Sequence, residues 1–352
     1  MGAQRVTTAN EPTTGTITPT MRGAVQHRYG SGEVLGVEHV PTPAPGSGEV
    51  LVRVRAAGVS RGAWHLMTGR PYLVRIGTGL RRPRRRIPGM ELAGEVVALG
   101  ADVTDFAVGD EVFGFGRSTF ADYAVAKTAR LAPMPVTLSF EQAAAVPDAG
   151  TTALQALVDH GRIRAGQHVL VIGASGGVGV HAVQLAAALG GEVTGVCSRA
   201  KVDLVREAGA THVVAYDDVE TVAYDDVETP EPGDRYDLVL DIGGNRPVRS
   251  LRRLLAPGGT LVFVGGEQGG RWFGGIGRQL RAVARAVVQR QRVVMFVAKE
   301  HREHLDEVAA QVATGALRPV IDRAVPLDQA GEAMQRLEAG QARGKLVVVP
   351  GS

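Results

Sequence analysis

Short segments in which apolar and polar residues alternate follow one another through the first part of the chain. Glu49–Arg55 alternates over its whole length, and Leu92–Leu99 and Phe120–Val125 are similar. A period of two residues is typical of strands that bury one face. Glycine and proline residues between these segments predict tight turns. Many short strands joined in this way predict a partly open β-barrel over residues 21–145.

From about Val146 the hydrophobic pattern changes. Continuous apolar runs now alternate with segments of helical period, such as Val178–Leu189. This arrangement is typical of parallel strands that helices cover on both faces. The apolar runs are Val169–Ile172, Val193–Val196, His212–Tyr216, Leu238–Leu240, Leu261–Val264 and Val293–Val297. Their number is that of a complete Rossmann sheet, so we predict a doubly wound parallel sheet over residues 146–298.

The last part of the chain, residues 299–352, mixes the two patterns. Helices are predicted at Glu303–Ala313 and Leu327–Leu337, and strands at Pro319–Val325 and Lys345–Val349. We expect this segment to return to the barrel. The predicted fold class is therefore α/β, with the parallel sheet inserted in the barrel domain. A cleft between two such domains is the usual place for a ligand.

The composition agrees with a globular protein of two domains. The 352 residues are 44% hydrophobic and 21% charged, with a formal net charge of +3 and a pI near 9.2. No uncharged apolar run is long enough to span a bilayer. Residues 1–20 lack the apolar core of a secretory signal, so we expect a flexible tail and a cytoplasmic protein. The single cysteine, Cys197, excludes an internal disulfide and a four-cysteine zinc lobe.

A glycine-rich loop follows the first predicted parallel strand and precedes a helix. It consists of Gly173, Ala174, Ser175, Gly176, Gly177, Val178 and Gly179. Glycines let the backbone turn tightly and approach a diphosphate, and the unpaired N–H groups of the helix N-terminus attract it. The position between a strand and a helix distinguishes such a loop from a chance cluster of glycines. We therefore predict that this loop binds a dinucleotide.

The end of the second parallel strand distinguishes NADH from NADPH. An NADH site usually has Asp or Glu about 20 residues after the loop, where it accepts a hydrogen bond from the ribose 2′-hydroxyl. Here the strand is followed by Ser198, Arg199 and Lys201, and no carboxylate is present. Cations favour a 2′-phosphate, which carries extra negative charge. NADPH is therefore predicted as the cofactor in preference to NADH, with these three residues at its phosphate.

Further motifs accompany the glycine-rich loop between Met21 and Pro350. They are Ala57–Ser60, Pro88–Val97, Phe106–Val112, Gly150–Ala153, Leu238–Asp241 and Gly344-Lys345. With these motifs the chain resembles the medium-chain dehydrogenase/reductase superfamily, and within it the zinc-free, zeta-crystallin-like quinone oxidoreductases. The resemblance implies a GroES-like catalytic domain and a homodimer. It also implies an enzyme that transfers hydride to a small quinone or an α,β-unsaturated carbonyl compound.

Zinc-dependent members of this superfamily hold the metal with Cys, His and a later Cys or Asp. At the matching positions this chain has Ser60 and Met90, with Glu91 and Asp148 nearby. Serine and methionine are poor zinc ligands, so we predict that no metal is bound. Without a Lewis acid, deprotonation of an unactivated alcohol is difficult. Reduction of a quinone or a polarised C=C bond needs only hydrogen-bond donors at the developing oxyanion.

The resemblance also implies residues around the substrate and the cofactor. The candidate catalytic residues are Ser60, His65 and Tyr72, of which His65 would relay a proton. A packing role for His65 and Tyr72 stays open, and Ala63 stands where the branch commonly has Asn or Asp. The Gly150-Thr-Thr turn is expected to begin the helix that enters the cofactor domain. The further implied cofactor contacts are Thr151 and Thr152 near the nicotinamide, Tyr216 near the adenosine phosphate, Gly265 and Gly266 beside the nicotinamide, and Lys345 at a phosphate.

Three features stay outside this scheme. Arg81–Arg86 has no interleaved aromatic residues, so a solvated loop is favoured over a nucleic-acid surface, and an anion-attracting rim for CoA esters stays open. Val214–Thr221 is repeated at once as Val222–Thr229, which is typical of a tandem duplication in a surface loop. Trp272 and Phe273 lie in a glycine-rich segment that we expect to cover the substrate or a partner subunit.

The sequence leaves three other functions open. They are reduction of 2-enoyl thioesters, metal-free oxidoreduction of alcohols or aldehydes, and binding of NADPH with little catalysis. Turnover of CoA esters would favour the first of these. NADPH affinity without turnover of quinones or enones would favour the last.

Overall fold

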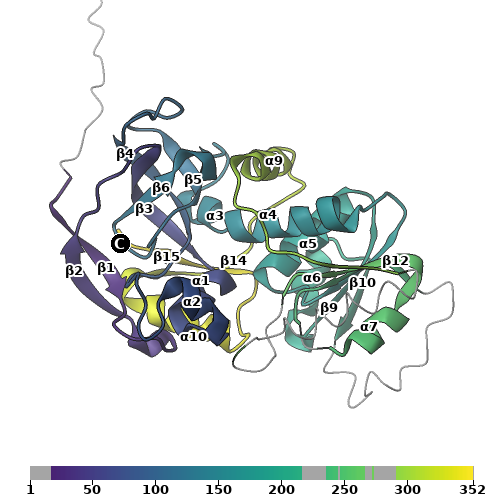
Figure 1. Cartoon of the computed structure of the whole chain (residues 1–352). Helices are drawn as coiled ribbons and strands as arrows, with labels where there is room; N and C mark the ends of the chain where they lie inside the picture. Colours follow the sequence, from purple (N-terminus) through teal and green to yellow (C-terminus); the bar gives the residue numbers. More distant parts are fainter. Residues whose placement is uncertain (1–16, 216–234, 245, 266–271, 273–290, 352) are drawn as a thin grey trace, which may run out of the picture.

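The computed structural model describes residues 17–215, 235–244, 246–265, 272 and 291–351. Figure 1 shows two lobes, and the segments from both ends of the chain lie in the same lobe. The middle of the chain forms the other lobe. The predicted α/β fold, with a parallel sheet inserted in a barrel domain, is therefore confirmed. Within the described ranges, no helix combines the length and the apolar character needed to cross a bilayer.

The middle of the chain forms a six-stranded sheet in the order β10-β9-β8-β11-β12-β13, in which all neighbours are parallel. Its central strands are buried because their apolar side chains face helices on both sides. The strands are β8 (His168–Ile172), β9 (Glu192–Cys197), β10 (His212–Ala215), β11 (Tyr236–Asp241), β12 (Leu255–Phe263) and β13 (Arg292–Met295). The helices that follow the first, second and fourth of them are α5 (Gly177–Ala188), α6 (Val202–Glu207) and α7 (Val248–Arg253).

Both ends of the chain contribute to a seven-stranded sheet in the order β14-β15-β3-β4-β5-β7, and β6 also pairs with β3. The strands are β3 (Glu49–Val59), β4 (Glu91–Leu99), β5 (Glu111–Phe115), β6 (Tyr123–Lys127), β7 (Leu131–Pro133), β14 (Ile321–Pro326) and β15 (Lys345–Val349). The return segment thus closes on the first part of the chain, because β15 runs antiparallel to β3. The helices of this lobe include α3 (Phe140–Ala144), α9 (Arg302–Ala313) and α10 (Ala330–Glu338).

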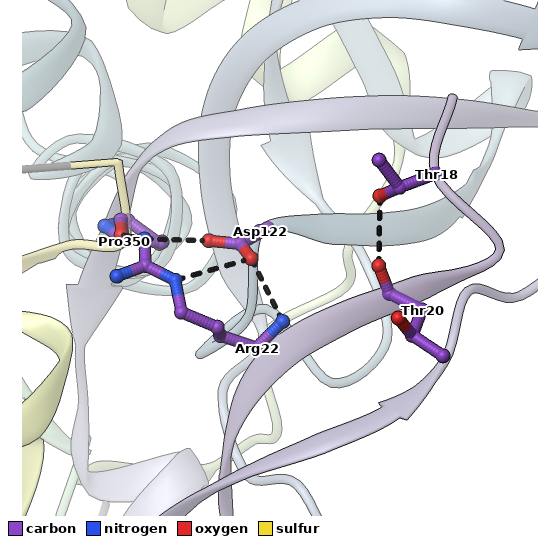
Figure 2. A network of polar contacts seen from close by, with 5 residues as sticks. All are labelled: Thr18, Thr20, Arg22, Asp122 and Pro350. Atoms are coloured by element: carbon purple, nitrogen blue, oxygen red, sulfur yellow. Dashed lines mark hydrogen bonds and ion pairs between the residues drawn. The ribbon is translucent and has the colours of Figure 1, made fainter. Parts of the chain in front are cut away.

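A hairpin that the sequence pattern did not predict precedes these strands. It consists of β1 (Thr20–Val25) and β2 (Gly36–Pro41), which pair antiparallel. Figure 2 shows how β1 is held: the guanidinium of Arg22 donates to the carboxylate of Asp122 at 3.0 Å and to the carbonyl of Pro350. The first strand is thereby hydrogen-bonded to the residue that follows the last strand, β15.

The link between the two lobes is the helix α4 (Pro147–Gln155), which continues into a π-helical turn at Ala156–Gly161. We expected the Gly150-Thr-Thr turn to begin this helix, and that prediction was wrong. Pro147 occupies its first turn, where the fixed φ of proline suits a helix start. Thr151 lies further in, and its hydroxyl donates to the Pro147 carbonyl at 2.6 Å.

Candidate functional site

The glycine-rich loop joins β8 to α5 and turns at Gly173. Gly173 has a φ of +87°, which L side chains rarely adopt. The N–H groups of Gly173 and Ala174 both donate to the Val196 carbonyl at 3.0 Å. An added Cβ at Gly179 would lie 2.1 Å from the Gly173 carbonyl oxygen. The helix therefore comes this close to the strand only because Gly179 has no side chain.

The first turn of α5 presents backbone N–H groups to an anion. Its first intrahelical bond runs from the Val180 N–H to the Gly176 carbonyl at 2.9 Å. The N–H groups of Gly177, Val178 and Gly179 precede this bond and have no partner within the helix. An added Cβ at Gly176 would meet only the Gly173 carbonyl oxygen, at 3.6 Å. Accessible backbone at the positive end of a helix fits the diphosphate of a dinucleotide.

The return segment lies against this loop. The Gly344 N–H donates to the Ser175 carbonyl at 3.0 Å, and Gly344 forms a parallel bridge with Gly176. Lys345 begins β15 and packs its aliphatic part on Gly177, where an added Cβ would lie 2.6 Å from the lysine Cδ. The structure therefore brings Lys345 to the predicted diphosphate loop, although the two are far apart in the sequence.

A buried carboxylate holds the ammonium group of Lys345. The lysine Nζ donates to Glu91 Oε1 at 2.6 Å, and the two side chains are 5% and 0% exposed. Glu91 Oε2 also accepts from the Asp148 backbone N–H at 3.0 Å. Burial raises the pKa of Glu91, although Lys345 opposes this shift. Burial raises the pKa of Asp148 in the same way. Glu91 and Lys345 therefore form a dry ion pair beside the loop, whereas Asp148 is only half-buried.

Neither this ion pair nor the histidine beside it was predicted from the sequence. His181 lies in α5, is 1% exposed, and its Nδ1 has no hydrogen-bond partner within the described ranges. Burial lowers the pKa of His181 to about 3, and the charge of Lys345 adds to the effect, so the imidazole is neutral. The sequence did contain one signal for these residues, because each of the three is a polar residue within or at the start of an apolar segment. Glu91 and Lys345 each open an apolar strand, and His181 stands within an apolar helix.

The residues that occupy the zinc-ligand positions of metal-dependent relatives have other roles in this protein. Ser60 caps α1 (Arg61–Thr68), since its hydroxyl accepts from the Ala63 N–H at 3.3 Å. An added Cβ at Gly62 would lie 3.1 Å from the Met90 sulfur and 3.7 Å from the Ser60 hydroxyl. A hydroxyl, a thioether and a carboxylate that is neutralised by an ammonium do not fit zinc. In the described part of the chain, no group of three or more His, Cys, Asp or Glu side chains converges.

The candidate catalytic side chains lie on α1 and the turn after it. The Nδ1 of His65 donates to the Arg70 carbonyl at 2.6 Å, so the Nε2 remains for proton transfer. Tyr72 begins a 3₁₀ turn, and its ring meets the Trp272 ring edge-on with centroids 5.4 Å apart. The Arg75 guanidinium lies 4.5 Å from the centre of the Tyr72 ring. These contacts orient Tyr72 without using its hydroxyl.

The predicted phosphate-binding cations lie where the return segment meets the end of β9. The Nζ of Lys201 donates to the carbonyls of Gly340 and Ala342 at 2.9 and 2.7 Å. In the opposite direction, Arg343 donates to the Ala200 carbonyl at 2.7 Å. Burial lowers the pKa of Lys201. The structure thus adds Arg343, which the sequence analysis did not identify, to the predicted phosphate site.

The other predicted residues fall into two groups. The first group lies within the described residues. Thr151 and Thr152 are buried in α4, and Ser198 and Arg199 lie directly after β9. Gly265 follows β12, and its N–H donates to the Asp241 carbonyl at 3.2 Å. Tyr216, Gly266, Phe273 and most of the duplicated segment lie outside the described residues.

Known proteins resemble this chain over almost its whole length. Residues 46–136 match the alcohol dehydrogenase GroES-like domain, and residues 208–348 match a family described as zinc-binding dehydrogenase. A chloroplastic quinone oxidoreductase of Triphysaria versicolor is 33% identical over 345 residues, which cover 94% of this chain and 98% of that protein. The chain belongs to the medium-chain dehydrogenase/reductase superfamily, in its quinone oxidoreductase branch.

Solved structures agree with this assignment. The quinone oxidoreductase of Coxiella burnetii has a TM-score of 0.81 and 27% identity, and the match covers 94% of this chain and 99% of that one. A mycobacterial protein solved in complex with NADPH has a TM-score of 0.79 and 25% identity, over 94% of this chain and 100% of that one. The predicted family is confirmed, and the chain is an oxidoreductase of the nicotinamide-dependent type.

Proposed function

We propose that this oxidoreductase uses NADPH to reduce quinones or α,β-unsaturated carbonyl compounds and that it needs no metal ion. The observation that carries the proposal is the buried Glu91–Lys345 ion pair, at 2.6 Å, next to Ser60 and Met90 in the region where relatives bind zinc. An ammonium at this carboxylate repels a divalent cation and neutralises the charge that would attract one.

The residues that would hold the cofactor follow from the loop geometry. The N–H groups of Gly177, Val178 and Gly179 would bind the diphosphate, and Lys201 and Arg343 would face a 2′-phosphate. Thr151 and Gly265 border the nicotinamide end in this proposal. When bound, the nicotinamide supplies the hydride.

His65 and Tyr72 are the proposed groups on the substrate side. With its Nδ1–H bonded to the Arg70 carbonyl, His65 can take up or release a proton only at Nε2. Tyr72 offers a hydroxyl that can donate to the oxygen on which charge develops. Both side chains stand on elements fixed by backbone and ring contacts, so little reorganisation is needed.

Turnover of a substrate panel tests the function directly. We expect NADPH oxidation with quinones and enones, and we expect the rate to be unchanged after treatment with EDTA. A zinc-dependent alcohol dehydrogenase treated in parallel serves as the control for the chelator. Inhibition by EDTA that added zinc reverses would contradict the metal-free proposal. Turnover restricted to enoyl thioesters would instead assign the protein to the thioester reductases.

Replacing Lys201 by alanine tests the choice of NADPH. Because a charge-assisted hydrogen bond contributes about 1.5–3 kcal/mol, the KM for NADPH should rise about 10- to 150-fold, whereas that for NADH should stay nearly constant. Lys201→Arg should restore most of the affinity for NADPH. The exposed Lys127 offers a matched control, since Lys127→Met removes the same charge far from the glycine-rich loop. An equal rise in both KM values would show that Lys201 acts only by joining the lobes.

A further inference from the structure

The loop between α2 (Arg75–Thr78) and β4 presents an unusual concentration of positive charge. Arg81, Arg82, Arg84, Arg85 and Arg86 are all exposed, whereas Pro83 between them is buried. No acidic residue occurs from Gly69 to Met90. In the part of the chain that the structure describes, none of these five guanidinium groups makes an ion pair or a hydrogen bond. Within the described ranges, the positive charge of this loop is therefore not neutralised by an acidic side chain.

The backbone of this loop is held in place. The Arg84 N–H donates to the Thr78 carbonyl at 2.8 Å, and the Arg86 carbonyl accepts from the Gln26 N–H at 2.8 Å. The hydroxyl of Tyr29 donates to the Gly79 carbonyl at 2.6 Å. The backbone that carries the arginines is therefore fixed by the rest of the lobe.

Large apolar side chains are exposed next to the arginines. They come from the turn that begins at Tyr72, from α2 and from the residue before Arg81. Their exposed fractions are 42% for Leu73, 65% for Ile76 and 72% for Leu80. Trp272, 68% exposed, extends the same surface, since its ring contacts Tyr72 and its carbonyl accepts from the Leu73 N–H at 3.2 Å. We call this surface, Leu73–Arg86 with Trp272, the arginine–aliphatic face.

The two kinds of side chain together indicate the partner. A nucleic acid would use the arginines but leaves the aliphatic tips of Ile76 and Leu80 in water. An anionic bilayer takes up both, because lipid phosphates bind guanidinium groups while the acyl boundary accepts aliphatic and indole side chains. A bilayer also needs no matching shape. We infer that the arginine–aliphatic face docks peripherally on membranes that contain anionic lipids.

This docking is independent of which substrate the enzyme reduces. It would turn the side of the catalytic lobe that carries Tyr72 towards the lipid, while the glycine-rich loop is on the other lobe. Each arginine near an anionic surface strengthens binding about fivefold, so several arginines together produce firm attachment at physiological salt. Because exposed charges are screened within about 8 Å at that ionic strength, attachment should weaken steeply as salt is added.

Sedimentation with lipid vesicles tests this inference on the full-length protein. We expect binding to vesicles with about one third phosphatidylglycerol and none to pure phosphatidylcholine vesicles. Replacement of Arg81, Arg82, Arg84 and Arg85 by glutamine should weaken binding about 100-fold or more, with turnover in solution unchanged. The matched control replaces four other exposed arginines, Arg164, Arg206, Arg318 and Arg323, and should bind nearly as wild type does.

A second variant separates docking on lipid from a general attraction to anions. Ile76→Ser with Leu80→Ser keeps every charge, and it should weaken vesicle binding about 10-fold while leaving its salt dependence intact. Three results would overturn the inference. They are wild-type protein that stays in the supernatant with anionic vesicles, a control variant that loses as much binding as the loop variant, and a serine variant that binds as wild type does. The last result, together with arginine-dependent binding to DNA, would identify a polyanion site instead.

Discussion

Replacement of Gly177 by aspartate is expected to raise the Kd for NADPH about 100- to 1,000-fold. The new carboxylate would stand in the first turn of α5, where the N–H groups of Gly177 and Val178 face the proposed diphosphate. Two like charges about 4 Å apart repel by about 4 kcal/mol at an effective dielectric constant of 20. Fluorescence titration of the purified variant measures the loss, and circular dichroism checks that it is folded.

Two further variants separate the charge from the added volume. Gly177→Ala places a Cβ 2.6 Å from the Lys345 Cδ, so the buried lysine chain has to shift, but no charge is added and the Kd should rise by about 10-fold at most. Gly36→Asp adds the same carboxylate where a Cβ meets nothing within 4 Å, and NADPH affinity should not change. A folded Gly177→Asp protein with wild-type affinity would show that the dinucleotide binds elsewhere.

The strand pattern predicted the fold well because its physical basis is local. Runs such as Leu238–Leu240 are apolar on both faces, and only a sheet covered by helices buries both faces. The hairpin of β1 and β2 escaped this reasoning because β2 is exposed along most of its length and carries no apolar alternation. Arg22 holds the hairpin through a residue 100 positions away, and such a partner has no signature in the local sequence.

The site was predictable to the extent that backbone chemistry defines it. Glycines between a strand and a helix indicate a diphosphate loop without any knowledge of the tertiary structure. The environment of Lys345 was not predictable in this way, because Glu91 lies 254 positions away in the chain. Arg343 was missed for the same reason, since only the return of the last segment to Ala200 places it beside Lys201. Contacts between residues that are far apart in the chain can be identified only once the fold is known.

The Glu91–Lys345 pair also makes the stability of the protein sensitive to the loss of one partner. Both side chains are almost fully buried, and the carboxylate has the Asp148 N–H as its other donor. Removal of one member of such a pair leaves an uncompensated charge in a dry site, which typically costs about 3–5 kcal/mol. Replacement of both members by neutral groups avoids that penalty.

Lys345→Met is therefore expected to lower the free energy of unfolding at neutral pH by about 3–5 kcal/mol, and Glu91→Gln in the same chain should recover most of it. In the single variant Lys345 no longer opposes the burial that raises the pKa of Glu91 above its ordinary value of 4.5, and only the hydrogen bond from the Asp148 N–H still does. The folded state then holds the Glu91 proton more tightly than the unfolded state does. Stability is accordingly greatest below pH 4.5 and falls as pH rises through the raised pKa, whereas the double variant lacks this slope.

Urea unfolding from about pH 5 to about pH 8 measures this dependence of stability on pH. The exposed Lys127 provides the control, since Lys127→Met is expected to change the free energy of unfolding by less than about 0.5 kcal/mol. A single variant as stable as the double variant across this range would show that Glu91 does not depend on Lys345.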